Sequence, residues 1–378
     1  MLLAACGIGI ALLAVAACRE PRRPIKIGVV FFNRNSPAAF MAAEEINAAG
    51  GIRGRFVQIV RDTIPTSAEP ADVEIQRARS IVAQGPLAVV GHGGSRGSLV
   101  AAPVYNDARV IQIVPTGTTR LLARAGKWTL PLPPNDSLEG AFIAAFVRDR
   151  LRASSVVIFY QSDEYGVGLR DGVAAGLAGS AVRVIREQRF DLRSPLDALV
   201  DAAVRTETPD VVVVAGRTPA TVAIVRRLAA LGLASRVVAG DGAVNLPDLV
   251  EQTGPAGQDR VYAATFWLRS AQDSASLRFV NAFESRVLHE ATATDALVYD
   301  AVRLLCEAAR ETGGGPDDVL EYLMSLGRSR PPYLGVTGLT GFGDIRLPPR
   351  LVMGVVHGTA LVAVGPERHD PVPPGARR

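Results

Sequence analysis

A serine lies at the centre of a glycine-rich loop that joins an apolar strand to an amphipathic helix. The loop reads Gly91-His92-Gly93-Gly94-Ser95-Arg96-Gly97-Ser98. Backbone N–H groups at such a helix start, with the helix dipole behind them, bind anions without a basic side chain. The stretch from Gly93 to Gly97 also fits the G-x-S-x-G pattern around a hydrolase nucleophile. The loop therefore predicts either an anion site or a nucleophilic serine.

The hydrolase alternative has histidines downstream of the serine, namely His289, His357 and His369. The pattern is nevertheless short and has two free positions in a chain with 37 glycines. His369 lies in a tail rich in proline and arginine, and a hydrolase leaves the second half of the chain unexplained. The sequence gives even less support to a nicotinamide-binding site, because Arg96 occupies the third glycine position of the G-x-G-x-x-G motif. We therefore favour binding over catalysis.

Three further polar motifs follow predicted strands: Thr116-Gly117-Thr118, Asp163-Glu164-Tyr165 and Gly240-Asp241-Gly242. Their side chains can contact a polar ligand, although each motif by itself is also ordinary turn or helix-start chemistry. We predict no metal site, no cofactor and no catalytic residue.

These motifs are positioned by an alternation of apolar strands and amphipathic helices that runs twice along the chain. Each run predicts a parallel sheet covered by helices on both faces. The proline-rich stretch Leu130–Asp136 is the natural linker between the runs. Because ligands bind at the carboxyl ends of parallel strands, two such sheets place the motifs on two walls of one cleft. The expected strands are Ile25–Phe31, Phe56–Val60, Leu87–Val90, Val110–Val114, Val156–Tyr160, Val182–Ile185, Val211–Ala215, Val237–Ala239 and Val261–Thr265. The expected helices are Asp72–Ala83, Gly97–Asp107, Leu138–Leu151, Val167–Leu177, Leu196–Arg205, Ala220–Leu231, Ser274–Leu288 and Thr294–Glu311, and a hairpin is expected over Leu351–Val364.

A stretch after the first strand carries a family resemblance. Glu44-Glu45-Ile46-Asn47-Ala48-Ala49-Gly50-Gly51-Ile52-Arg53-Gly54-Arg55 closely resembles the first helix of the branched-chain amino-acid binding proteins, extracytoplasmic receptors of ABC transporters. Here Gly50-Gly51 supplies the left-handed residue with which helices commonly end. The resemblance runs, with gaps, from about Ile25 to about Val364. It implies the type I periplasmic-binding fold, in which two Rossmann-like α/β lobes are joined by a three-segment hinge.

The resemblance also implies roles for five residues. Ser95 falls where the family hydrogen-bonds a ligand carboxylate, and the Thr116 backbone and Thr118 hydroxyl fall at two further ligand-binding positions. Tyr165 matches the aromatic residue that packs on the ligand backbone. Asp241 matches the carboxylate that pairs with the ligand ammonium.

Three departures from the family pattern bear on specificity. The loop Phe32–Pro37 is short, and Arg96 lies beside Ser95. Arg217 stands where amino-acid binders often carry an aromatic, and we include it among the predicted ligand contacts. Two arginine forks would suit an extra ligand carboxylate, whereas solvated arginines at a cleft rim are the commoner outcome.

The N-terminus resembles a lipoprotein signal. Met1–Ala17 carries no charge, and Val15-Ala16-Ala17-Cys18 resembles a bacterial lipobox, in which Cys18 is lipidated and becomes the mature N-terminus. Two acyl chains on one cysteine suffice for stable anchoring. The alternative is an uncleaved transmembrane helix, for which this run is at the short limit, and the positive n-region of a signal peptide is missing. Cys306 is expected to be a core hydrophobe without a function.

The charge pattern disfavours a nucleic-acid binder. The formal charge is +4, but only Lys26 and Lys127 are lysines, and the arginines are scattered among nearly as many carboxylates. A basic stripe with interleaved aromatics is missing from the sequence. A repressor on a related fold is disfavoured because no helix-turn-helix precedes Ile25.

We predict a membrane-anchored periplasmic receptor, not an enzyme, that binds an amino acid or related small polar solute and delivers it to an ABC permease. The alternative on the same fold is an envelope sensor or partner-binding protein. The predicted division is a signal peptide at 1–17, a tether at 18–24, lobe 1 at 25–134 plus 267–335, lobe 2 at 135–266 plus 336–364, and a flexible tail at 365–378.

Overall fold

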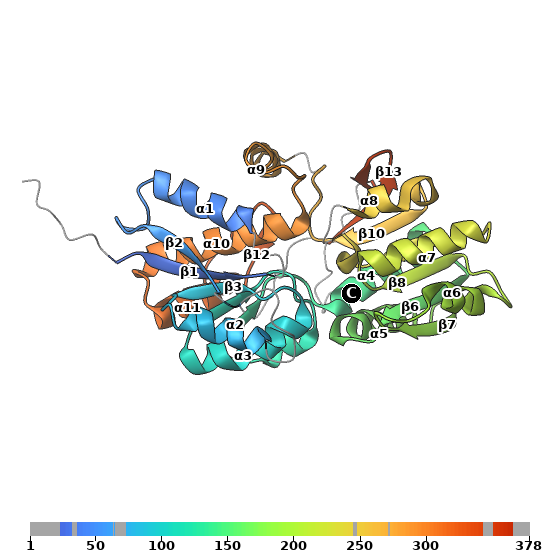
Figure 1. The fold of residues 1–378 in the computed structure, drawn as a ribbon, viewed down its shortest axis with the longest axis horizontal. Coiled ribbons are helices and arrows are strands. Elements are labelled where there is room, and N and C mark those ends of the chain that lie inside the picture. The colour runs from blue at the N-terminus through green and yellow to red at the C-terminus, as the bar shows by residue number, and fades with distance from the viewer. Residues whose placement is uncertain are drawn as a thin grey trace, which may run out of the picture.

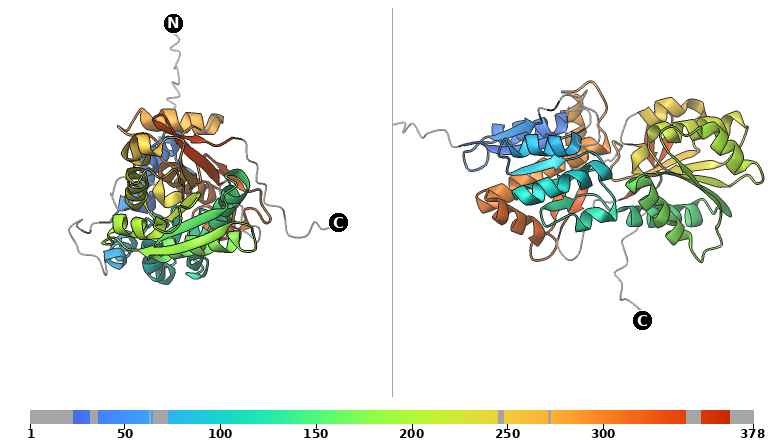
Figure 2. Two further views of the ribbon diagram at one scale, coloured as in Figure 1. Left: turned by 90° about the vertical axis from the view of Figure 1, so that its right-hand side faces the viewer. Right: turned by 60° about the horizontal axis from the view of Figure 1, so that its bottom comes forward.

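The computed structural model describes residues 23–31, 36–62, 64, 73–244, 248–270, 273–342 and 351–365. The predicted signal, Cys18 and the residues after 365 lie outside the described residues. The described chain forms two main sheets, each flanked by helices, that lie side by side along the long axis of the molecule (Figure 1). We call the first sheet with its helices lobe 1 and the second with its helices lobe 2. Figure 2 shows the molecule along its long axis (left) and the two lobes side by side from a further direction (right).

Lobe 1 is built on a parallel sheet of five strands in the order β2-β1-β3-β4-β5. Successive residues of β1 point to opposite faces, as the pleat requires. Ile27 and Val29 pack in the core with α1 and α10, whereas Val30 packs in the core with α2 and α3. The strands are β1 Ile25–Val30, β2 Val57–Arg61, β3 Ala88–Gly91, β4 Ile111–Val114 and β5 Thr129–Pro131. The helices are α1 Pro37–Ala48, α2 Val73–Val82, α3 Ser95–Ala108, α9 Ser274–Glu284, α10 Ala293–Thr312 and α11 Pro316–Ser325, with a 3-10 turn at Arg120–Arg124.

Lobe 2 contains a sheet of seven strands in the order β14-β13-β10-β9-β8-β6-β7. Strands β6 to β10 pair in parallel, and β13 and β14 add antiparallel strands at one edge. The strands are β6 Ser155–Gln161, β7 Arg183–Phe190, β8 Val211–Ala215, β9 Arg236–Ala239, β10 Val261–Thr265, β13 Val352–His357 and β14 Ala360–Ala363. The helices are α4 Asp136–Ala145, α5 Glu164–Leu177, α6 Leu196–Val204, α7 Thr218–Ala230 and α8 Asp248–Thr253, with a π turn at Phe146–Arg150 and 3-10 turns at Asp241–Ala243 and Gly254–Gly257.

Two glycines bring α4 and α5 unusually close together. A Cβ atom on Gly140 would lie 2.4 Å from the backbone carbon of Gly172, and one on Gly172 would lie 2.5 Å from the carbonyl oxygen of Asp136. Contacts this short exclude any side chain at either position. The first turn of α4, which carries Asp136 and Glu139, is therefore held directly against α5.

The sequence placed the start of the linker and the third crossing incorrectly. Leu130 and Pro131, the first two residues of the predicted linker, belong to strand β5 and pair with β4, so the chain leaves lobe 1 only after them. The predicted lobe bounds place the third crossing between residues 335 and 336, but these residues lie in a hairpin between β11 (Tyr333–Gly335) and β12 (Gly338–Thr340). Phe342 still packs in the lobe 1 core. The third crossing therefore falls between Phe342 and β13, not at residue 336.

Most other predicted elements are confirmed to within a few residues. Gly50 and Gly51 adopt the expected positive φ values of 92° and 71°, and β13 and β14 form the expected hairpin. Strand β7 runs five residues beyond its predicted end at Ile185, to Phe190, and α8 and α11 were not predicted. Within the described residues, no helix combines the length and apolar character needed to cross a membrane.

Candidate ligand-binding site

The Ser95 hydroxyl ties together the two polar loops of lobe 1. Ser95 opens α3 directly after the β3 loop, and its Oγ accepts hydrogen bonds from the backbone N–H groups of Thr118 and Thr119, both at 3.3 Å. Thr116 joins the same loops, because its Oγ1 accepts from the Gly94 N–H at 3.1 Å. The loops after β3 and β4 thus form one unit, as expected where neighbouring parallel strands end.

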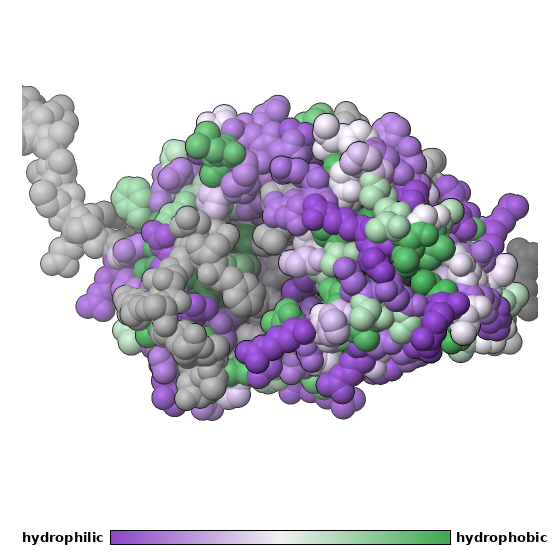
Figure 3. Space-filling view, turned by 45° about the vertical axis from the view of Figure 1, so that its right-hand side comes forward, coloured by the Kyte–Doolittle hydropathy of each residue, from purple (hydrophilic) through white to green (hydrophobic). Residues whose placement is uncertain are grey.

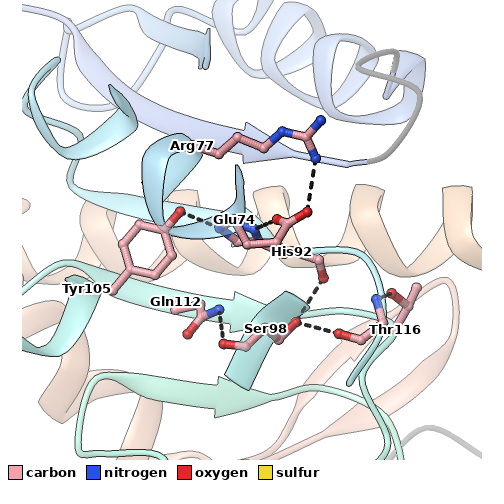
Figure 4. A network of polar contacts seen from close by, with 8 residues as sticks. Glu74, Arg77, His92, Ser98, Tyr105, Gln112 and Thr116 are labelled. Atoms are coloured by element: carbon pink, nitrogen blue, oxygen red, sulfur yellow. Dashed lines mark hydrogen bonds and ion pairs between the residues drawn. The ribbon is translucent and has the colours of Figure 1, made fainter. Parts of the chain in front are cut away.

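A buried polar network lies behind these loops (Figure 4). The His92 ring is held on both sides, by the Glu74 carboxylate at Nδ1 and by the Tyr105 hydroxyl, 2.8 Å from Nε2. Ser98 Oγ donates to the carbonyl groups of His92 and Gly94. Burial alone would raise the pKa of Glu74, but His92 and Arg77 more than offset this and lower that pKa. Through the contacts of His92 and Ser98, this network holds the loop that carries Ser95 in place.

Lobe 2 contributes a buried group of acidic and phenolic side chains. The Asp241 N–H donates to Glu139 Oε1 at 2.7 Å, and the Gly242 N–H donates to the Tyr165 hydroxyl at 2.9 Å. The exposed fractions of Glu139, Asp241 and Tyr165 are 0%, 2% and 5%. Burial raises the pKa of both carboxyl groups, and the neighbouring Asp241 adds to the rise at Glu139.

Asp136 connects the two lobes. Its N–H donates to the Thr118 carbonyl oxygen at 2.8 Å. Burial raises the pKa of its carboxyl group to about 7; the Thr118 hydroxyl counters part of this effect, and the charge of Asp241 adds to it. Neither Asp136 oxygen has a partner with hydrogen-bond geometry among the described residues.

A cavity of about 430 Å³ opens beside Asp136 and is lined from both lobes. Lobe 1 contributes Arg96 and residues 119–121, and lobe 2 contributes Asp136 and parts of the β6–α5 loop and α5. The cavity lining does not include the predicted ligand contacts Ser95, Thr116, Thr118, Tyr165 and Asp241, and of these only Thr116 is more than marginally exposed. In Figure 3, hydrophilic side chains cover much of the face of the molecule, with apolar ones interspersed.

A family model described as a periplasmic binding protein matches residues 32–344. The chain belongs to this family. An amino acid binding protein of Pseudomonas aeruginosa is 30% identical over 208 residues, which span 54% of this chain and 55% of that protein. The Leu/Ile/Val-binding protein homolog 1 of Brucella abortus is 25% identical over 312 residues, or 81% of each chain.

Solved structures of periplasmic binding proteins share the two-lobed fold. A branched-chain amino acid transporter substrate binding protein of Streptococcus pneumoniae, in complex with isoleucine, has a TM-score of 0.78 at 22% identity and covers 91% of this chain and 100% of its own. A solute binding protein of Rhodopseudomonas palustris, in complex with 3,4-dihydroxy benzoic acid, has a TM-score of 0.74 at 17% identity, covering 90% and 96%. The type I periplasmic-binding fold predicted from the sequence is confirmed.

Arg217 lies at the edge of the buried group in lobe 2 of this periplasmic binding protein. Its guanidinium pairs with Asp163 at 2.5 Å and stands 5.6 Å from the centre of the Tyr165 ring, and its side chain is 43% exposed. Arg96 is also exposed and lines the cavity. The two arginines that we singled out therefore occupy the rim rather than the interior.

The geometry around Ser95 gives the hydrolase alternative no support. The hydrogen bonds of the three described histidines go elsewhere: His92 to Glu74 and Tyr105, His289 to the Glu290 carbonyl, and His357 to Asp259. His289 and His357 are exposed, and His369 lies outside the described residues. The relatives of this chain named above are binding proteins.

Sequence reasoning missed Asp136 and Glu139. Both lie in the first turn of α4, where acidic side chains usually complement the helix dipole. Their spacing of three residues places them on one face of the helix. That spacing was the available signal, but the pattern gave no sign that this face is buried against α5. Groups of three or more His, Cys, Asp or Glu side chains arranged to hold a metal ion are not found within the described residues.

Proposed function

We propose that this chain is an extracytoplasmic solute-binding lipoprotein that delivers an amino acid or related small polar solute to an ABC permease. One observation carries the proposal: the lobes present opposite polarity to each other. Lobe 1 offers the N-terminus of α3 and the hydroxyls of Ser95 and Thr118. Lobe 2 offers the carboxyl groups of Asp241 and its neighbours. A solute with an anionic end and a cationic end fits between them.

This polarity supports the roles that the family resemblance implies for the predicted residues. Ser95, Thr116 and Thr118 bind the carboxylate of the solute, and Asp241 binds its ammonium group. Tyr165 packs on the solute backbone from lobe 2. Arg217 reaches the solute from the rim if it releases Asp163. Since relatives bind solutes as different as isoleucine and a dihydroxybenzoic acid, the proposal rests on the site and not on the fold.

A thermal-shift screen of the mature protein tests this function. The panel holds amino acids, amides, urea and small carboxylates, and each amino acid is paired with its analogue that lacks the amino group. A ligand at a hundred times its dissociation constant adds about 2.7 kcal/mol to the folded state, which is readily detected. We expect at least one amino acid to stabilise the protein and its deaminated analogue to fail. Stabilisation by the carboxylates alone would contradict the role of Asp241.

The anchor is proposed from Cys18 together with the extracytoplasmic character of the family. Cell-made protein should lose residues 1–17, incorporate labelled fatty acid and sediment with membranes. The Cys18→Ser variant should lose the label and, because it keeps the binding lobes, retain the solute response. An unprocessed Met1 form as the main species by intact mass would exclude the lipoprotein.

Transport and sensing share this fold and site. An envelope sensor or partner-binding protein is the alternative, and reconstitution with a candidate permease distinguishes them. Solute-dependent stimulation of the permease ATPase supports transport, and binding without stimulation supports sensing.

A further inference from the structure

Glu139 and Asp241 place two buried carboxyl groups next to each other in lobe 2, where a hydrogen bond from the Asp241 backbone to Glu139 joins the two residues. Glu139 is 0% exposed and Asp241 is 2% exposed. Glu139 uses one oxygen, Oε1, to accept from the Asp241 N–H. Its other oxygen, Oε2, and Asp241 Oδ1 are both buried, and neither has a hydrogen-bond partner among the described residues. Two carboxyl groups can hydrogen-bond to each other only when one of them carries a proton.

Two ionised carboxylates in contact away from water are strongly unfavourable, so one of a buried pair keeps its proton. The proton can leave only when another positive group takes its place. We propose that Glu139 and Asp241 share one proton in the empty site, and that the cationic end of the solute displaces this proton to solvent. The second half of this proposal rests on the proposed function; the first half does not.

The charges around the pair indicate which residue holds the proton. Asp241 keeps the charge, because the Tyr165 hydroxyl and the Arg217 guanidinium both favour its ionised form. Glu139 holds the proton, because it is fully buried and the negative charges of Asp241 and Asp136 disfavour its ionisation. The remaining neighbours are Asp163, which pairs with Arg217, and Arg120, which acts on Asp136 from lobe 1.

Asp136 provides the route by which the proton leaves. It follows Asn135, the cap residue of α4, one turn before Glu139, and it lines the 430 Å³ cavity. Both of its oxygens are free to accept a proton. On binding, the proton passes from Glu139 by way of Asp136 to water in the cavity. The N–H groups of the solute then replace it at Glu139 Oε2 and Asp241 Oδ1. A primary ammonium or a guanidinium supplies enough N–H groups for this, whereas a simple carboxylate supplies none.

Infrared spectroscopy of the ligand-free protein tests the shared proton directly. A protonated carboxyl group has a C=O stretch that carboxylates and amides lack at that frequency. We expect wild type to retain this band at pH 8, where Asp136 is ionised, and Glu139→Gln to lose it. The matched control is Glu207→Gln, which removes an exposed carboxylate paired with Arg183 and should leave the band unchanged. An unchanged band in folded Glu139→Gln would overturn the proposal.

If Glu139→Gln fails to fold, Asp241→Asn decides instead. This variant replaces the carboxylate that receives the hydrogen bond with an amide, so the band should shift in frequency. A band that neither shifts nor weakens in Asp241→Asn would place the proton elsewhere and overturn the proposal.

Calorimetry with L-leucine and L-arginine as probes tests the displacement. Titrations in two buffers of different ionisation enthalpy count protons, and we expect release of about one proton per bound amine. Affinity should therefore rise up to about tenfold per pH unit in the range where release is complete. Glu139→Gln should bind with little proton release. Binding by wild type without release would overturn the displacement while the amino-acid function stands. Failure of every amino acid in the thermal-shift panel to bind, with the infrared band present, would overturn the function and the displacement and leave the shared proton established.

Discussion

At the scale of single residues, the site is distinguished by polar groups that are buried and only partly satisfied. The Thr118 hydroxyl and the carboxyl groups of Asp136, Glu139 and Asp241 all retain buried oxygens without a partner among the described residues. Such groups cost about 1 to 3 kcal/mol each when left unpaired. We propose that a bound polar solute supplies the missing hydrogen-bond partners of these groups and so offsets that cost.

Asp136 predicts how the stability of the ligand-free protein depends on pH. Its pKa is about 7 in the folded protein, against 3.8 for an ordinary aspartate. When folding raises the pKa of a group, the folded state binds its proton more tightly than the unfolded state does. The resulting contribution to the free energy of unfolding is fully present below the unfolded-state pKa and is lost as the pH rises to the folded-state pKa. Between pH 5 and pH 8 we therefore expect a loss on the order of 2 to 4 kcal/mol.

Urea denaturation of the ligand-free protein across this range measures the loss. Asp136→Asn should flatten the pH dependence because the amide does not titrate. Asp317→Asn, an exposed and weakly paired aspartate, serves as the control and should keep the wild-type slope. A ligand-free protein that grows steadily more stable from pH 5 to pH 8 would contradict the assignment.

The hydrogen bonds of Ser95 predict that removing its hydroxyl lowers the stability of the protein. A serine that acted only as a nucleophile would not require this effect. Its hydroxyl accepts two backbone N–H groups in a buried setting. Ser95→Ala should lower the free energy of unfolding by about 1 to 3 kcal/mol without any ligand, since both donors lose their acceptor. Ser285→Ala, whose hydroxyl bonds only an exposed helix end, should change little. Equal stability of the two variants, with covalent labelling of Ser95 by a fluorophosphonate, would restore the hydrolase alternative.

At the scale of helices and strands, the sequence correctly predicted the features that depend on local residue patterns. The strand and helix order, the glycine stop after α1 and the β13–β14 hairpin all followed from apolar periodicity and turn residues. The start of the linker was misplaced because Thr129–Pro131 pairs with β4 despite its proline. The third crossing was misplaced because Tyr333–Gly335 and Gly338–Thr340 form a hairpin that was not predicted. The burial of Asp136 and Glu139 could not be predicted from the local pattern. It depends on how closely α4 approaches α5.

The close approach of α4 and α5 can be tested at Gly172. A methyl group there would lie 2.5 Å from the Asp136 carbonyl oxygen and 3.1 Å from Ser137 Cα. Because both atoms belong to the backbone, Gly172→Ala should force the helices apart and destabilise the protein by about 1 to 3 kcal/mol. It should also weaken solute binding, since Asp136 and Glu139 move with α4. Ala175→Ser adds one atom on the exposed face of the same helix and should change neither property. Wild-type stability in Gly172→Ala would show that α4 is not held by this contact.

At the scale of the whole molecule, the two lobes supply different parts of the proposed site. Ser95, Thr116 and Thr118 belong to lobe 1, and Tyr165 and Asp241 belong to lobe 2. The resemblance to a known family allowed these positions to be named from the sequence; their part in binding stays a prediction. The chain passes between the lobes three times, which allows them to move as rigid bodies about a short hinge.

The burial of this site predicts domain opening. Ser95, Tyr165 and Asp241 are 3%, 5% and 2% exposed, so a solute cannot reach them in the conformation described. The ligand-free protein must therefore populate an arrangement in which the lobes separate, and a solute that contacts both lobes favours the closed one.

Small-angle scattering should give a smaller radius of gyration with the cognate solute than without it. Mass spectrometry should recover the solute unchanged. An identical radius of gyration in both states, with saturating solute confirmed by calorimetry, would contradict the hinge mechanism and place the binding site outside the interface between the lobes.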